Sequence, residues 1–155
     1  MDERPLNQLE PGEKGRIIRL GGAGSIRRRL MDMGMVSGAV VDVERVAPLG
    51  DPIKIGIKGY DLALRKNEAE HVIVEVTGGL LSNVPAGETV VISGVRAGRG
   101  MQRRLVRQGL VPGLAVRVVS SGGPGPVVVE NGGARQALGH GVARKIYVVY
   151  PADNP

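Results

Sequence analysis

The fold is decided by a stretch of 15 residues that the chain carries twice: residues 24–38, GSIRRRLMDMGMVSG, and residues 99–113, RGMQRRLVRQGLVPG. The aligned pairs share one offset of 75 residues: Leu30 with Leu105, Gly34 with Gly109, and Gly38 with Gly113. Each copy predicts a short basic helix, a glycine stop and a turn that ends in a second glycine. The repeat therefore divides the 155 residues into two small domains of the same design.

The first copy has the periodicity of a helix. Ile26, Leu30 and Met33 recur at i, i+4 and i+7, so they share one face. We expect Ser25 to cap the N-terminus and Gly34 to take the left-handed conformation that follows the C-terminus. A helix of two to three turns is not stable alone, so it should plug the open end of a small barrel.

The arginines of this helix stand where its dipole disfavours them, in the first turn. Arg28 and its equivalent Arg103 point about 180° away from the apolar stripe and are free to meet a partner. Arg29 and its equivalent Arg104 flank the stripe, so their stems are expected to cover the core. Two interpretations of the helix stay open: a solvated basic face, or a contact surface for an anionic partner.

Composition narrows the classes of partner. The net charge of +6 suggests nucleic acid, anionic lipid or an acidic protein surface. The chain has no Phe, no Trp and three Tyr, which weakens the case for single-stranded nucleic acid, since such sites rely on aromatic stacking. Duplex binding through phosphates remains open. The absence of cysteine excludes disulfides, thiolate metal sites and cysteine nucleophiles, and it fits a reducing cytoplasm.

The ends of the sequence carry no targeting signal that we recognise. Residues 1–5, MDERP, are charged and are followed by no apolar region of the kind found in signal peptides. No apolar run approaches the roughly 20 residues of a membrane-spanning helix. The tail, residues 151–155, is expected to be disordered.

The segments around each helix are rich in β-branched residues and predict a mainly β fold. In the first half, short strands are predicted at 15–20, 40–46, 53–58, 62–66 and 72–76, with a turn at 68–71. Five short strands and one short helix are the content of an SH3-like barrel. The second half repeats the pattern, so we expect two tandem SH3-like barrels at residues 1–76 and 80–150, joined by a short linker at 77–79.

Several motifs in this order resemble a FeoA domain. In the first half they are PGE at 11–13, RRLMDMGM at 28–35, APLGDP at 47–52, and LALRK at 62–66. The second half resembles the same family through AGE at 86–88, GLVPG at 109–113, and Gly125-Pro126. It departs at residues 121–124, SGGP, and where Gly139-His140 replaces Arg65-Lys66.

The resemblance implies a cytoplasmic accessory protein of bacterial ferrous iron uptake that is not an enzyme. The partner it implies is FeoB, the membrane permease with a cytoplasmic G domain, so the chain would be peripheral to the membrane at most. Two alternatives stay open. One is a metal-responsive regulatory module related to the C-terminal domain of diphtheria-toxin-repressor-type regulators, and the other is a basic RNA-associated barrel. Self-association is also left open.

Two surfaces are candidates for contact with a partner. The first is the basic helix, with Arg27 and Arg28 in the first repeat and Arg103 in the second. The second is the rigid loop of the first repeat, since exposed loops on a barrel often carry recognition. Its residues are Pro48, Leu49, Gly50 and Asp51.

Metal and catalytic constellations are weak in this sequence. Iron(II) sites favour two histidines and a carboxylate, and the two histidines, His71 and His140, fall in different repeats. Glu68, Glu70 and His71 are close in sequence but indicate a structural turn, and the methionines at 31, 33 and 35 indicate core packing. No nucleophile motif or phosphate loop is present. We therefore predict no resident cofactor and no metal ligands, and leave direct Fe(II) binding open.

Overall fold

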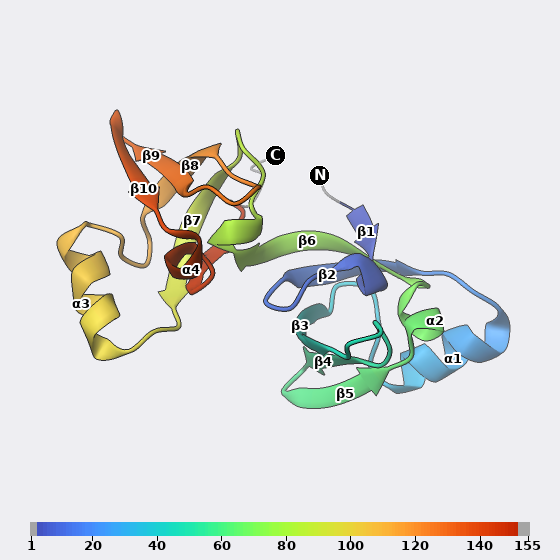
Figure 1. Ribbon diagram of the computed structural model, residues 1–155. Coiled ribbons are helices and arrows are strands. Elements are labelled where there is room, and N and C mark those ends of the chain that lie inside the picture. Colours follow the sequence, from blue (N-terminus) through green and yellow to red (C-terminus); the bar gives the residue numbers. More distant parts are fainter. Residues whose placement is uncertain (1–2, 152–155) are drawn as a thin grey trace. The chain divides into compact units, whose positions relative to one another are not determined.

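The structure is a computed structural model that describes residues 3–151 (Figure 1). It consists of two compact units, Met1–Thr77 and Gly78–Pro155, called unit 1 and unit 2 below. Of the tail expected to be disordered, residues 152–155 lie outside the described residues.

Unit 1 is built on an antiparallel sheet with the strand order β6-β2-β3-β4-β5, and β1 pairs with the outer side of β6. Among the described strands, no pairing joins β5 back to β6, so the hydrogen-bonded ladder stays open there. The elements are β1 (Glu3–Pro5), a 3₁₀ turn (Leu6–Gln8), β2 (Lys14–Leu20), α1 (Gly24–Asp32), β3 (Val40–Val46), β4 (Ile53–Ile57), β5 (Tyr60–Leu64), α2 (Lys66–Ala69) and β6 (Val72–Leu80).

Unit 2 repeats this plan with the strand order β10-β9-β8-β7-β11, and β11 pairs with residues 78–80 at the end of β6. Its elements are a 3₁₀ turn (Leu81–Asn83), β7 (Thr89–Val95), α3 (Arg99–Arg107), β8 (Ala115–Ser120), β9 (Val127–Asn131), β10 (Ala134–Leu138), α4 (His140–Ala143) and β11 (Ile146–Val149). The prediction of two mainly β, SH3-like units is confirmed.

The same backbone hydrogen bonds recur in both units. The N–H of Gly12 donates to the carbonyl of Val43 at 2.8 Å, and Gly87 donates to Val118 at 2.7 Å. The glycines that end the repeated stretch do the same with the first long strand: Gly38 donates to Ile17 at 2.7 Å and Gly113 to Ile92 at 2.8 Å. All four glycines have positive φ, between 92° and 95°. The glycine repeat seen in the sequence is therefore a repeat of turn geometry.

Each unit has its own apolar core, and the helix contributes one fully buried anchor to it. Leu30 of α1 is buried in unit 1 and Leu105 of α3 in unit 2. The residue after each glycine stop is buried as well, Met35 in one unit and Leu110 in the other. The pairing of the repeats read from the sequence is thus also a pairing of core positions.

Three local expectations differ from the structure. Ser25 is not the cap of α1: the helix begins at Gly24, and Ala23 holds the N-cap position without a side-chain hydrogen bond. Each unit has a second, four-residue helix, α2 or α4, where one helix was expected. Residues 77–79, expected as a linker, lie in strand β6. Gly78 suits a paired strand because a Cβ there would stand 2.6 Å from the carbonyl oxygen of Val148 on β11.

Candidate partner-binding surfaces

Helix α1 is positioned by tight turns at both of its ends. Before it, Gly22 has a φ of 90° and packs so closely on the ring of His71 that a Cβ would lie 3.1 Å from it. After it, Gly34 has a φ of 93°, and the N–H of Met35 returns to the carbonyl of Leu30 at 3.0 Å. These turns bury Leu30 and leave the three arginines of the helix exposed.

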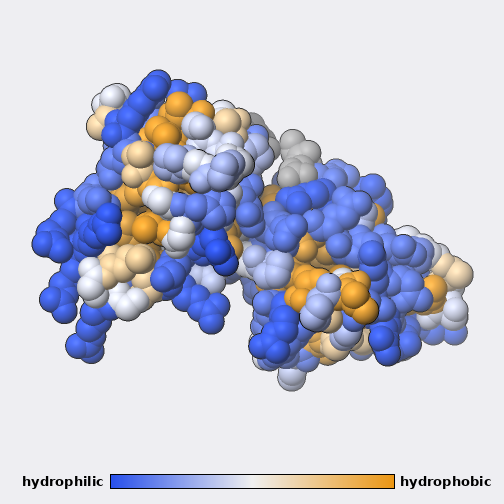
Figure 2. Space-filling view, in the orientation of Figure 1, coloured by the Kyte–Doolittle hydropathy of each residue, from blue (hydrophilic) through white to orange (hydrophobic). Residues whose placement is uncertain are grey.

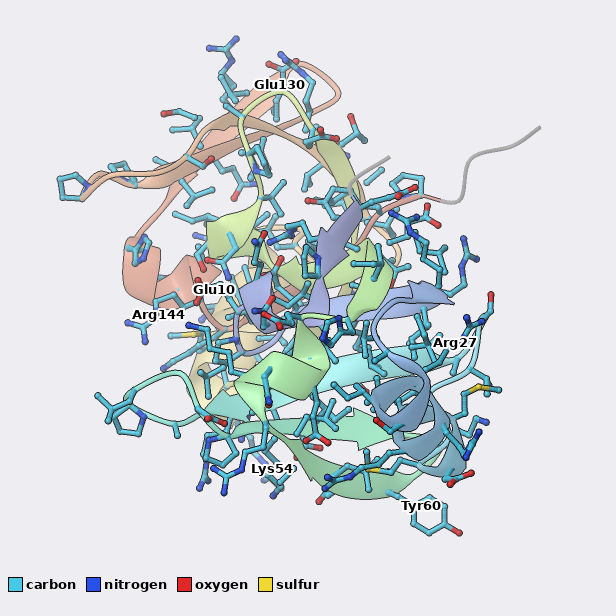
Figure 3. All side chains as sticks on the ribbon, turned by 90° about the vertical axis from the view of Figure 1, so that its right-hand side faces the viewer. Glu10, Arg27, Lys54, Tyr60, Glu130 and Arg144 are labelled. Carbon is cyan, nitrogen blue, oxygen red and sulfur yellow. The ribbon has the colours of Figure 1, made fainter. Side chains whose placement is uncertain are left out.

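The three arginines of α1 differ in their surroundings. Arg29 lies beside Glu68 of α2, with its Nε 3.2 Å from Oε2. Arg27 and Arg28 make no side-chain hydrogen bond or ion pair with any other residue between 3 and 151. Figure 3 shows Arg27 projecting from unit 1 at α1. Arg27 and Arg28 are thus available to a partner, whereas Arg29 is occupied within the fold.

The loop at 47–52 is closed by its own backbone. The N–H of Ala47 donates to the carbonyl of Pro52 at 3.1 Å, and Gly50 donates to Ala47 at 2.7 Å. Leu49, at the tip, is 92% exposed, the largest exposed fraction among the large apolar residues described. Leu49 is therefore fully accessible to a partner.

The short helix α2 holds both candidate surfaces of unit 1. At its start, Asp51 of the loop accepts a hydrogen bond from the N–H of Lys66 at 3.1 Å. One turn on, the buried carboxylate of Glu68 accepts the N–H of Arg65 at 2.9 Å and also pairs with Arg29 of α1. Asp51 therefore has a structural role that the sequence did not show. A shallow recess of about 480 Å³ lies here, lined by Asp51, Arg65, Lys66, Asn67 and Glu70.

Unit 2 lacks this bracing. At an offset of 74 residues, Gly125 stands where unit 1 has Asp51, His140 stands for Lys66, and Val142 for Glu68. Arg104 of α3, the equivalent of Arg29, has no side-chain partner among the residues that the structure describes. The second copy keeps the fold without the polar network.

The exposed face of α3 carries the predicted residue Arg103. It lines a shallow recess of about 540 Å³ together with Arg99, Gln102, Val106 and Arg107. Val106 is 60% exposed, although it is apolar. The sequence prediction included Arg103 and missed the rest of this face. The missed signal is the spacing of 99, 103, 106 and 107, which places these residues on one side of a helix.

The residues considered for metal binding do not gather. Glu68 is engaged as described above, and Nε2 of His71 lies 3.5 Å from the exposed Glu70. Within residues 3–151, no three His, Asp or Glu side chains are grouped as metal ligands would be. The methionines also separate: Met35 is buried, Met33 is half-buried and Met31 is 49% exposed, so only Met35 belongs fully to the core.

Comparison with known proteins assigns the family. Residues 4–76 and 80–150 each match the model of the FeoA domain. The chain belongs to the FeoA family. It is a tandem FeoA protein, and the family consists of accessory proteins of ferrous iron transport that are not enzymes.

Three relatives illustrate the similarity. An Fe(2+) transport protein A/Fe(2+) transporter FeoB fusion protein of Porphyromonas gingivalis is 33% identical over 85 residues, which cover 55% of this chain and 10% of that protein. A putative Fe(2+) transport protein A of Methanocaldococcus jannaschii is 37% identical over 62 residues, 40% of this chain and 74% of that protein. The solution structure of iron(II) transport protein A from Clostridium thermocellum has a TM-score of 0.52 and 33% identity, covering 96% of this chain and 89% of that one.

The described helices are all short. None in residues 3–151 has the length and apolar character needed to cross a membrane.

Proposed function

We propose that the chain is a cytoplasmic accessory and regulatory binding protein of ferrous iron uptake that acts by contact with a FeoB-type permease. The supporting observation is the Porphyromonas gingivalis relative, whose name joins an Fe(2+) transport protein A and the FeoB transporter in one polypeptide. Covalent linkage of two modules raises their effective concentration for each other, which is useful where the modules work in contact.

The contact surface that we propose is on unit 1. Arg27 and Arg28 of α1 have no partner in the described part of the fold, and Leu49 presents an exposed apolar anchor on the loop with Pro48 and Gly50. Helix α2 fixes both elements through Glu68 and Asp51. A partner would meet a preorganised surface, which limits the ordering cost of binding. Arg103 holds the place of Arg28 on α3 and is the corresponding contact residue of unit 2.

The test is a titration of the full chain against the soluble cytoplasmic G domain of the cognate permease, in each nucleotide state. We expect Arg28→Glu to weaken binding about tenfold, equivalent to about 1.4 kcal/mol, because it places a like charge against an acidic surface. The matched control is Arg45→Glu on β3, also exposed and without a described partner, which should change binding less than about twofold. Thermal unfolding should be unchanged in both variants.

The outcomes separate the role from the site. Binding that survives Arg28→Glu but is weakened by Leu49→Ser would keep the role and move the contact to the loop. Equal weakening by Arg28→Glu and Arg45→Glu would show a response to net charge and not to a specific surface. Absence of binding in every nucleotide state would reject the proposed contact with the G domain.

A further inference from the structure

The net positive charge of the chain is confined to one half of it. Unit 1 contains 12 basic and 12 acidic residues, whereas unit 2 contains nine basic and three acidic residues. The whole net charge of +6 therefore belongs to unit 2. In its described part the acidic residues are Glu88 and Glu130, and Glu130 already lies 3.5 Å from Arg117 and 3.0 Å from Arg135. The remaining cations of unit 2 have little to neutralise them.

Helix α3 gathers these cations on one face. Arg99, Arg103 and Arg107 follow one another at i, i+4 and i+8, so they form a row along the exposed side. None of the three has a side-chain hydrogen bond or ion pair with another described residue. Val106 lines the same recess at the side of the row, and no acidic residue lines it. Figure 2 shows hydrophilic side chains projecting over α3.

The equivalent face of α1 is much less basic. At the offset of 75, Gly24 stands where α3 has Arg99, and Asp32 stands where α3 has Arg107. The two copies thus differ at the surface while they agree in the core. Arg107 lies in the last turn, where the helix dipole favours a cation, but Arg99 lies at the start of the helix, where the dipole disfavours one. Arginines four residues apart also repel one another. A binding role therefore accounts for Arg99 better than a structural one.

We propose that the exposed face of α3 is a docking site for an acidic amphipathic helix of a partner protein. Arginines four residues apart are displaced by about 6 Å along a helix axis, and so are glutamates at i and i+4 on a partner helix. The arginine fork matches a carboxylate in two parallel hydrogen bonds, which a lysine cannot do. An apolar side chain of the partner helix would cover Val106, which lies beside the row. The site deepens the proposed role of Arg103 as the contact residue of unit 2, and it adds Arg99, Val106 and Arg107 of the same helix. The peptide test below uses no permease, so it can fail or succeed separately from the contact proposed for unit 1.

Other anionic partners use this face less well. A phosphate backbone brings no apolar group for Val106, and the two tyrosines of unit 2 are half-buried, so they offer no exposed stacking platform. An anionic lipid surface would attract the arginines, but α3 presents one exposed apolar side chain, which is too few for insertion into the acyl region. A protein segment uses both the charge and the apolar side chain.

The probe is a fluorescent synthetic helical peptide with glutamates at i, i+4 and i+8 and a leucine within the same face. A matched peptide has glutamine in place of each glutamate. Anisotropy titrations use the full chain at physiological salt, and we expect binding of the glutamate peptide at about 10 μM, which corresponds to about 7 kcal/mol. The double variant R103E/R107E should bind it at least tenfold more weakly. Val106→Asp, which removes the apolar contact and repels carboxylates, should act in the same direction.

The matched control is R144E/K145E, which changes the charge of unit 2 by the same amount at exposed positions outside α3. Figure 3 shows Arg144 beside α4. This control should bind the peptide within about twofold of the unmodified chain. Thermal unfolding of every variant identifies any loss that comes from misfolding, and Val106→Asp carries the test if R103E/R107E does not fold.

Four results would overturn the proposal. Equal losses of affinity for the glutamate peptide in R103E/R107E and R144E/K145E would show that binding responds to net charge and not to the face of α3. Equal binding of the glutamine peptide, or no binding of either peptide, would remove the role of carboxylates. Titrations with phosphatidylglycerol vesicles and with a DNA duplex complete the set. If either one binds more tightly than the glutamate peptide, and R103E/R107E weakens that binding, then it and not an acidic helix is the occupant of the site.

Discussion

At the scale of single residues, Glu68 does the most for the candidate surface of unit 1 without being part of it. Its side chain is 9% exposed, and it joins the start of α2 to Arg29 of α1. Buried carboxylates are costly unless they are paired and hydrogen-bonded, and Glu68 meets both conditions. The residue therefore joins α2 and α1 into one supported arrangement.

Replacing Glu68 by Ala should lower the free energy of unfolding by about 2 kcal/mol, because the N–H of Arg65 loses its acceptor and α2 its cap. The measurement is urea unfolding followed by circular dichroism, since the chain has no tryptophan to report by fluorescence. Glu70→Ala is the control: Glu70 is exposed, and its loss should cost less than about 0.5 kcal/mol. Equal costs for the two variants would show that the cap contributes nothing.

Residue-level prediction from the sequence succeeded where a pattern repeats and failed where a contact is long-range. Apolar spacing placed Leu30 on the buried face, and the repeat extended that placement to its equivalent Leu105; both are buried. Ser25 was wrongly given the cap, since the sequence does not show that the glycine turn lets the helix begin one residue earlier. The bond from Glu68 to Arg29 joins residues 39 positions apart, and no local pattern predicts it.

At the scale of elements, both long helices depend on a left-handed residue after the last turn. Gly34 after α1 has a φ of 93°, and Gly109 after α3 has a φ of 78°. No backbone atom lies near the Cβ that Gly34 lacks; its neighbours within 4 Å belong to the flexible side chain of Lys58. The demand for glycine is therefore conformational and not steric.

Gly34→Ala should cost about 1 kcal/mol, the typical penalty for placing a Cβ in the left-handed region. Gly24→Ala is the matched control within the same helix. Gly24 has open space around its missing Cβ and lies in the first turn, so alanine there should be neutral or slightly stabilising. Thermal unfolding of the two variants decides the point, and a destabilisation of the same size at both positions would contradict the argument.

The strands were predicted better than the short helices. Residues 40–46 form a strand with the predicted bounds, because dense β-branched residues between turn signals leave few alternatives. α2 and α4 were missed, since four residues carry no periodicity. In the candidate site, Arg27 and Arg28 could be singled out by their position on a helix. The face around Val106 carried a signal of the same kind in its helical spacing, but that signal was missed.

At the scale of the whole molecule, the chain keeps one fold twice and gives the copies different surfaces. Unit 1 is electrically balanced and braced by Asp51 and Glu68, whereas unit 2 lacks both acids and concentrates the positive charge. Core positions and turn glycines are repeated because each unit must fold by the same packing. Surface positions do not have to satisfy that packing. The surface residues that differ between the copies are therefore the ones that would let each unit recognise its own partner.

The boundary between the units gives the last prediction. This boundary lies within strand β6: residues up to Thr77 belong to unit 1, and Gly78 begins unit 2, where it pairs with Val149. In Gly78→Ala the new Cβ would meet the backbone oxygen of Val148 at 2.6 Å, and a backbone oxygen cannot move away as a flexible side chain can. We expect a loss of about 1–3 kcal/mol, with reduced amide-exchange protection in β7 and β11 and unchanged protection in β3 and β4. Gly94→Ala on β7 is the control, because nothing lies within 4 Å of its missing Cβ. Loss of protection spread evenly over both units would contradict the assignment of Gly78 to the packing of unit 2.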